Sequence, residues 1–262
     1  MISLGPFALA LERLFAILGI LLFMAAASWI DRRHGGGSEK AAWRALLVGV
    51  LAARLGFVAQ NWPAFAVDPA TILYVWQGGF SPFAGLSAAA IMLVLSLWTS
   101  RARLPMALAF AASAAAAIAA TSLFLAAAQR PFPPGLVLHS LDGEARPLDS
   151  YRGKPMVINL WATWCPPCRR EMPMLAEEAA RSPVPILLVN QGEEAAKLRA
   201  WLQGEGLTPA PVLIDRDQRL AAATGSTGLP ATLFVDSKGV IREVHVGEIS
   251  RAALLAGLRT LD

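Results

Sequence analysis

The distribution of apolar positions divides the chain into two halves. Before Arg130 the sequence consists mainly of long apolar runs, whereas after it short apolar segments alternate with polar and charged ones. Prolines and a glycine are concentrated directly after Arg130, which is typical of a linker. We therefore predict two domains, at residues 1–130 and 131–262, of different fold class.

Four apolar stretches in the first half have, or approach, the roughly 20 residues that a transmembrane helix needs. They cover residues 7–30, 41–60, 82–98 and 104–128, and the third is short unless it extends through 78–81. No positive residue precedes the first stretch and an arginine pair follows it, which favours a retained helix over a cleaved signal peptide. The pattern predicts an all-α domain of four transmembrane helices.

The second half alternates between short apolar runs and amphipathic segments. Strands are expected at residues 137–139, 156–161, 186–190, 211–214, 232–236 and 240–246, and helices at 165–180, 193–203, 218–223 and 250–261. Strands that alternate with helices in this way indicate an α/β sandwich.

The charge balance differs between the halves. The chain carries a formal net charge of +4 and has a pI of about 9.5. Residues 1–130 hold nine of the 23 Lys and Arg and four of the 19 Asp and Glu, which leaves 14 against 15 for the rest. The excess positive charge therefore accompanies the apolar stretches, and the second half has no basic stripe of the kind that binds nucleic acid.

Positive residues in the connections predict the orientation of the helices. The first connection and its borders carry Arg32, Arg33, Lys40 and Arg44, and the third carries Arg101 and Arg103. The second connection, residues 61–81, has no Lys or Arg. Because positive loops stay in the cytoplasm, both termini are expected outside. In a Gram-negative bacterium, the second domain would then extend from the inner membrane into the periplasm, where disulfides form.

The only two cysteines are Cys165 and Cys168. They are too few for a four-thiolate zinc site, and we expect neither a metal nor a cofactor. At the start of the expected helix, Cys165 would have a lowered thiol pKa and act as the nucleophile of disulfide exchange. Cys168, nearly one turn later, would resolve the mixed disulfide. The alternative, a structural disulfide, would close a minimal loop and stabilise the fold little.

The sequence Trp-Cys-Pro-Pro-Cys at 164–168, within the segment that begins at Asn159, resembles the thioredoxin superfamily. It is most similar to the membrane-tethered TlpA, ResA and CcmG-like branch, and the resemblance covers residues 132–262. It implies a thioredoxin-like α/β fold and thiol–disulfide oxidoreductase activity. Asn159 departs from cytoplasmic thioredoxins, which carry a buried aspartate at this place.

The same resemblance implies roles for residues around the cysteines. Pro230 matches the family's cis-proline, and Leu229 and Trp164 are expected to contact the substrate. Glu171, on the same helix face as Cys168, matches an acidic residue implicated in proton handling. An ordinary trans proline and a glutamate favoured by the helix dipole alone are the alternatives.

Part of the first half resembles a second family. Arg54-Leu-Gly-Phe, Asp68-Pro, Trp76-Gln-Gly-Gly-Phe-Ser and Gly85-Leu resemble the early part of prolipoprotein diacylglyceryl transferase, over residues 50–90. Phe83 replaces a family histidine, and further polar residues of that enzyme have no counterpart. The resemblance therefore implies a related membrane scaffold without lipid-transfer activity. An unrelated four-helix anchor is the alternative. Arg54, inside its expected span, is interpreted either as a packing partner or as a contact to a lipid headgroup or a partner.

These observations predict a membrane-anchored enzyme that reduces disulfides in selected exported proteins, with cytochrome c maturation as one setting. A disulfide oxidase or isomerase is the first alternative, and a lipid-binding or scaffold protein with an accessory thioredoxin domain is the second. The first half contains no cysteine and cannot relay electrons by thiol exchange. The expected partners are therefore protein disulfides, a separate membrane electron donor and membrane lipid, but no nucleic acid.

Overall fold

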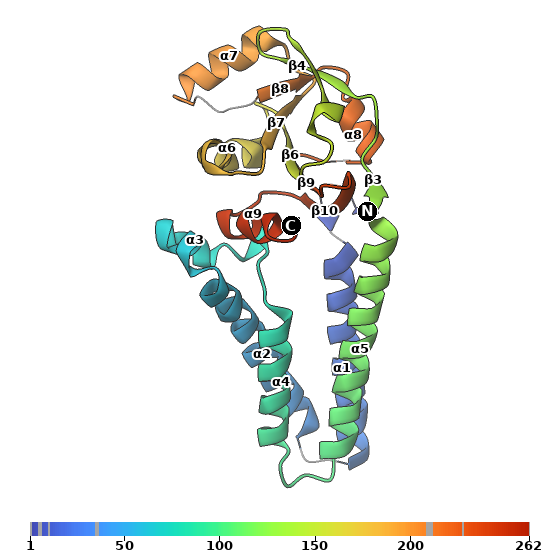
Figure 1. Cartoon of the computed structure of the whole chain (residues 1–262). Helices are drawn as coiled ribbons and strands as arrows, with labels where there is room; N and C mark the ends of the chain where they lie inside the picture. Colours follow the sequence, from blue (N-terminus) through green and yellow to red (C-terminus); the bar gives the residue numbers. More distant parts are fainter. Residues whose placement is uncertain are drawn as a thin grey trace. The chain divides into compact units, whose positions relative to one another are not determined.

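The computed structural model describes residues 2–4, 7–9, 11–34, 37–207, 212–226 and 228–261. The chain forms two compact units, a helical one made of residues 1–75 and 79–126, and an α/β one made of residues 127–262 together with 76–78. Figure 1 shows the elements of both. The expected strand at 211–214 begins at residue 211, which lies outside the described residues.

The helical unit is built from four long or moderately long helices. A short hairpin, β1 (Ile2–Leu4) and β2 (Phe7–Leu9), precedes α1 (Leu11–His34) and α2 (Ser38–Gln60). The connection to the next long helix holds α3 (Trp62–Val67), η1 (Pro69–Leu73) and η2 (Val75–Gln77). The last two helices are α4 (Pro82–Ser96) and α5 (Arg103–Ala128).

Three of these helices, α1, α2 and α5, are long and apolar enough to cross a membrane. The third expected span is shorter than predicted, because α4 has 15 residues and measures about 22 Å, against a hydrocarbon core of about 30 Å. Its expected extension through 78–81 is not helical, since Gly78 and Gly79 adopt positive φ angles of 80° and 82°. The first helix also begins later than residue 7, which lies in β2.

Small residues allow α2 and α4 to approach closely. A Cβ atom added to Gly85 would lie 3.0 Å from the carbonyl oxygen of Gly49 and 2.9 Å from Cβ of Ala53. In an apolar solvent, where burial of apolar surface gives little gain, such close backbone packing is a main source of helix association. The two helices therefore form a tightly packed pair within this unit.

Arg54 is buried in α2 and holds the connection that follows. Its guanidinium donates to the carbonyl oxygens of Ile72 at 3.0 Å, Thr71 at 2.8 Å and Gly79 at 2.9 Å. It also lies over the rings of Phe65 and Phe80, with 5.5 and 5.8 Å to the ring centroids. Of the two interpretations left open by the sequence, these contacts support a packing partner.

The α/β unit is one eight-stranded sheet with helices on both faces. Its strands are β3 (Arg130–Pro131), β4 (Val137–Ser140), β5 (Ala145–Pro147), β6 (Met156–Trp161), β7 (Ile186–Gln191), β8 (Val212–Asp215), β9 (Ala231–Val235) and β10 (Val240–Val246). Their order is β3-β10-β9-β6-β7-β8-β4-β5. Within it β6, β7 and β8 are parallel neighbours, while β9 runs antiparallel to β6.

The helices of this unit are α6 (Pro166–Arg181), α7 (Ala195–Gly204), α8 (Arg219–Thr224) and α9 (Arg251–Leu258), with a 3₁₀ turn η3 at Leu148–Tyr151. Buried residues of α6, α7 and α9 share one apolar cluster with the sheet, and Leu220 of α8 belongs to the cluster on the other face. Figure 1 shows α8 across the sheet from α6.

Alternation along the central strand explains the two clusters. In β6, Val157 and Trp161 face α6, whereas Ile158 and Leu160 face the opposite side. The side chain of Asn159 therefore points to the α6 face although all six strand residues are buried. A buried polar residue at the centre of such a strand needs a polar partner, and its partner identifies the site described below.

The predicted fold class is confirmed, because a helical region precedes a thioredoxin-like α/β sheet. The sequence missed β3 and β5, which are two and three residues long and exposed, so no apolar alternation marks them. The helix expected from residue 193 begins at Ala195. Glu193 lies before it, and its side chain accepts a hydrogen bond from the N–H of Thr163.

Candidate redox site

The two cysteines form a disulfide at the start of α6. The S–S distance is 2.04 Å and the Cα atoms are 5.3 Å apart. Cys165 is the N-cap of α6, and its sulfur accepts a hydrogen bond of 3.3 Å from the N–H of Cys168. Proline follows Cys165 directly, where a missing N–H costs the helix nothing. Both cysteines are buried, at 3% and 0% exposure, so only Cys165 reaches the surface at all.

The loop between β6 and α6 is held by a buried carboxylate. Glu193, which follows β7, accepts hydrogen bonds from the N–H of Thr163 at 2.7 Å and from its hydroxyl at 2.6 Å. Asn190 and Lys197 donate to the same carboxylate at 2.8 and 2.6 Å. Burial alone raises the pKa of Glu193, but hydrogen bonds from Lys197, Thr163 and Asn190 outweigh it and lower the pKa to about 2. Glu193 therefore stays ionised at neutral pH, and its hydrogen bonds hold the loop that precedes Cys165.

Glu171 lies inside the domain, one turn after Cys168 on α6. Its Oε1 accepts a hydrogen bond from Nδ2 of Asn159 at 2.8 Å, and its Oε2 accepts one from the N–H of Ile249 at 2.8 Å. Burial, with 3% exposure, raises the pKa of Glu171 to about 8 against the opposing effect of these hydrogen bonds. The charge of Glu248 raises the pKa further, and that of Arg170 lowers it.

The pKa of Glu171, near 8, is close to that of an ordinary cysteine thiol. The ordinary pKa of a cysteine is about 8.5, so a proton passes between such a carboxylate and a thiol at little cost in free energy. An exposed glutamate, with a pKa of 4.5, would be a much weaker acceptor. The site therefore combines a cysteine pair with a buried carboxyl group of raised pKa on the same helix face.

Three further residues named from the sequence lie around this pair. Trp164 directly precedes Cys165 and is 65% exposed, which makes it one of the most exposed large apolar side chains of this unit. The Leu229–Pro230 peptide bond is cis. Leu229 is half-buried and packs against the apolar cluster that contains both cysteines. Ala231, which follows Pro230, pairs with Leu160 near the end of β6 that leads to Cys165.

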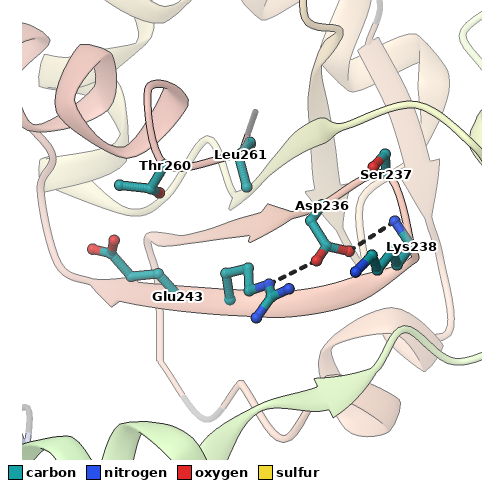
Figure 2. Close-up of a pocket in the computed structure, with 7 residues that line it drawn as sticks. Asp236, Ser237, Lys238, Glu243, Thr260 and Leu261 are labelled. Carbon is teal, nitrogen blue, oxygen red and sulfur yellow. Dashed lines mark hydrogen bonds and ion pairs between the residues drawn. The ribbon is translucent and has the colours of Figure 1, made fainter.

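A hollow elsewhere in the domain does not belong to this site. It has a volume of about 390 Å³ and lies at the β9–β10 turn, lined among others by Asp236, Lys238 and Arg242. The carboxylate of Asp236 accepts hydrogen bonds from Nε of Arg242 at 2.6 Å and from the backbone N–H of Lys238 at 2.9 Å. Figure 2 shows Asp236 and Lys238 at this turn. Pro230 directly precedes β9, whereas this turn follows the other end of the strand, where Asp236 caps it. Within the described part of the chain, no group of His, Cys, Asp and Glu forms a metal site.

Sequence reasoning identified the cysteines and Glu171 but missed their supporting contacts. It noted Asn159 only as a departure from cytoplasmic thioredoxins, and it read 193–203 as a plain amphipathic helix. The adjacent Glu193 and Glu194 gave no signal that one carboxylate turns inward. The contact between Thr163 and Glu193 joins residues 30 positions apart. It depends on the order of the strands in the sheet, which the sequence pattern does not predict.

Two protein families match different parts of the chain. Residues 130–244 match the AhpC/TSA family, and residues 1–127 match the prolipoprotein diacylglyceryl transferase family. The thiol-disulfide oxidoreductase ResA of Geobacillus thermodenitrificans is 34% identical over 131 residues, which is 49% of this chain and 75% of ResA. The thiol:disulfide interchange protein DsbE of Escherichia coli is 35% identical over 99 residues, 38% of this chain and 53% of DsbE.

The exposed lipoprotein thioredoxin of Streptococcus pneumoniae aligns with 48% of this chain and 98% of its own, at 28% identity and a TM-score of 0.45.

Proposed function

The chain belongs, through its C-terminal domain, to the ResA-like family of thiol-disulfide oxidoreductases, and we propose that it reduces disulfides of exported proteins from a membrane anchor. The observation that carries the proposal is the Cys165–Cys168 disulfide at the start of α6, with Glu171 buried on the same helix face. This arrangement supports the proposal that Cys165, Cys168 and Glu171 are the catalytic residues.

The reaction begins with the reduced pair. The thiolate of Cys165 attacks one sulfur of a substrate disulfide, so that a mixed disulfide forms and the first substrate sulfur leaves as a thiolate. Cys168 then gives its proton to the carboxylate of Glu171 and attacks the sulfur of Cys165. The Cys165–Cys168 bond forms, the second substrate sulfur leaves as a thiolate, and each substrate thiolate takes up a proton from the solvent. Two electrons pass from the dithiol to the substrate, which ends as two thiols.

The surface around Cys165 is proposed to bind the substrate. Trp164 offers an exposed apolar ring next to the nucleophile, and Leu229 with Pro230 offers backbone at the neighbouring strand end. An extended segment around a substrate cysteine fits such a surface. Partly unfolded precursors with cysteine pairs, such as apocytochrome c, meet this requirement.

The reduction potential of the pair tests the direction of the reaction. We expect the full chain, equilibrated in detergent micelles with glutathione or dithiothreitol buffers, to show a value near the roughly −270 mV of thioredoxin. The readout is unambiguous because the chain has no other cysteine. A value near the roughly −120 mV of DsbA would contradict the reductase and support the oxidase or isomerase alternative.

We propose that the helical unit anchors the protein in the membrane. The helices α1, α2 and α5 have the length and hydropathy of spans, and many of their large apolar side chains are exposed, such as Leu22, Leu51 and Leu123 at 60%, 63% and 72%. In water, such extended apolar surface would cause aggregation, whereas lipid covers it. The match to the diacylglyceryl transferase family supports a membrane scaffold, and Phe83 in place of a family histidine argues against lipid transfer.

The orientation of the scaffold makes a further prediction. Since the connection between α4 and α5 carries Arg101 and Arg103, we expect it in the cytoplasm and the C-terminus in the periplasm. Protease added to spheroplasts should therefore remove a tag fused after residue 262. A tag inserted near Arg101 is the matched control and should be protected until the membrane is broken. The reverse pattern would show that the domain is cytoplasmic.

Electrons must reach the pair from another protein in this proposal. The helical unit has no cysteine, so it cannot re-reduce the Cys165–Cys168 disulfide by thiol exchange. A separate membrane protein with a dithiol of lower potential is the required partner class. It would attack the sulfur of Cys165, because Cys168 has no exposed surface.

A further inference from the structure

The partner of Glu171 inside the domain is the side-chain amide of Asn159. Nδ2 of Asn159 donates to Oε1 of Glu171 at 2.8 Å and also to Oγ1 of Thr232 at 3.1 Å. Asn159 and Thr232 are fully buried and face each other in register on β6 and β9. In this orientation Glu171 receives two hydrogen bonds, from Asn159 and Ile249, which suits its ionised form.

The oxygen of the same amide stands out by its lack of contacts. Among the residues that the structure describes, Oδ1 of Asn159 is buried and has no hydrogen-bond partner. A buried acceptor without a partner is costly, and its presence in a native fold calls for an explanation such as a role in catalysis. It also means that no contact on the oxygen side fixes the amide in one orientation.

Protonation of Glu171 reverses the direction of the hydrogen bond that this carboxyl group can form with the Asn159 amide. The ionised form only accepts hydrogen bonds, whereas the neutral form has an O–H that must donate. A half-turn of the Asn159 amide about its last side-chain bond brings Oδ1 to the present place of Nδ2, facing Oε1. Thr232 fits both orientations, because a hydroxyl accepts from Nδ2 in one and donates to Oδ1 in the other.

We propose that Asn159 is a positioning residue whose amide turns each time Glu171 gains or loses a proton, with Thr232 as its partner in both states. The inference rests on the proposed role of Glu171 as the proton acceptor. When the proton of Cys168 arrives, its S–H bond breaks and an O–H bond forms on Glu171, without transfer of electrons. The turned amide then accepts from that O–H, so neither state of Glu171 is left unpaired.

Glu171 exchanges its proton in the pH range in which thiols ionise. Burial raises the pKa of Glu171 to about 8, close to the range in which thiols ionise. The other charged groups that influence it are Glu248 and Arg170, which form an ion pair of 2.6 Å with each other and act in opposite directions. An aspartate in place of Asn159 would add a second negative charge against Glu171, whereas an amide supplies a donor and an acceptor without charge.

Isotope labelling of asparagine tests the turning directly, because the chain has only Asn61, Asn159 and Asn190. The oxidised full chain, labelled in Asn and Glu side chains, is studied by NMR in detergent micelles from about pH 5 to pH 10, a range centred on thiol and raised carboxyl pKa values. We expect a nuclear Overhauser effect between the Nδ2 protons of Asn159 and the side chain of Thr232 above the titration midpoint of Glu171. Below the midpoint this effect should disappear.

Two controls accompany this experiment. Asn190 donates to Glu193, whose pKa is lowered, so its amide signals should stay constant over the whole range. The variant Glu171→Gln identifies the Glu171 carboxyl signal by its loss, and it should make the Asn159 pattern independent of pH.

The possible outcomes separate the inference from the function on which it rests. Loss of the Asn159–Thr232 effect with the same midpoint as Glu171 supports the turning amide. Persistence of the effect while Glu171 titrates would overturn the inference, because Asn159 would then be a fixed donor, and would leave the role of Glu171 intact. Absence of any Glu171 titration in this range would overturn both.

Discussion

Replacement of Cys165 by serine is expected to lower the rate of disulfide exchange by at least about 10³-fold, to the background of the buffer. Of the two cysteines, only Cys165 has any exposed surface, and a hydroxyl is a poor nucleophile toward disulfides. The loss should appear as the absence of reduced product when the full chain, pre-reduced and in detergent micelles, is mixed with a peptide disulfide.

The variant Cys168→Ser is the matched control for this loss. It removes the same disulfide but keeps the nucleophile, so it should form a mixed disulfide with the substrate that is not resolved. Mass spectrometry without added reductant detects this adduct, and Cys165→Ser should not form it. The proposed redox function would be wrong if both variants formed the adduct alike, or if a cell with the Cys165→Ser variant kept the protein's role. The scaffold alternative would then be favoured.

The size of the loop excludes a simple loss of stability as the cause. The disulfide closes a loop with a sequence separation of three, for which the chain-entropy relation gives about 2 kcal/mol. This is a modest fraction of the stability of an ordinary domain, about 5–15 kcal/mol. Both serine variants should therefore remain folded, which the circular dichroism of the α/β unit would check.

The elements that carry the chemistry were predictable because their signals are local. The apolar run of β6, the Cys-Pro-Pro-Cys spacing and the start of α6 follow one another within about 15 residues, so periodicity and helix-start preferences were enough. The same holds for the long apolar helices. The α4 helix was overestimated because hydropathy does not register the positive φ angles of Gly78 and Gly79.

The surroundings of Glu171 could be predicted only in outline. The spacing of Glu171 from Cys168 placed it on the same helix face, but its raised pKa comes from burial in the packed domain. Its hydrogen-bond partners Ile249 and Asn159, which lower the pKa in part, lie 78 and 12 positions away in the chain. Similarly, the anchor of Thr163 on Glu193 depends on β7 lying beside β6. Such long-range contacts follow from the packed fold and leave no pattern in the local sequence.

The pH dependence of folding gives a first test of the buried state of Glu171. Its pKa is about 8 in the fold, above its ordinary value of 4.5, so between these values the native state holds a proton that the unfolded chain has lost. This contribution to stability is complete below about pH 4.5 and is lost as the pH rises through about 8. We expect the Glu171→Gln variant to lose this part of the pH dependence, as measured by chemical unfolding of the α/β unit in the full chain.

The same variant is expected to lower the rate of exchange about a hundredfold near pH 8, the low end of what general acid–base catalysis contributes. Glutamine has nearly the shape of the neutral carboxyl group but cannot accept a proton from Cys168, so the mixed disulfide should accumulate. In the unaltered chain the rate should rise with pH through about 8 as Glu171 ionises, and the variant should lack this step. Stopped-flow mixing with a peptide disulfide, followed by acid quench and alkylation, measures both steps.

Glu177→Gln is the matched control for this measurement, because Glu177 lies on α6 as well but forms ion pairs with Arg181 and Arg251 at the surface. It should keep the rate and the pH profile within about twofold, in line with the small contribution of exposed ion pairs. An unchanged rate in Glu171→Gln would show that water, rather than Glu171, takes the proton of Cys168. In that case the early-helix glutamate would be explained by the helix dipole and by its contacts to Asn159 and Ile249 alone.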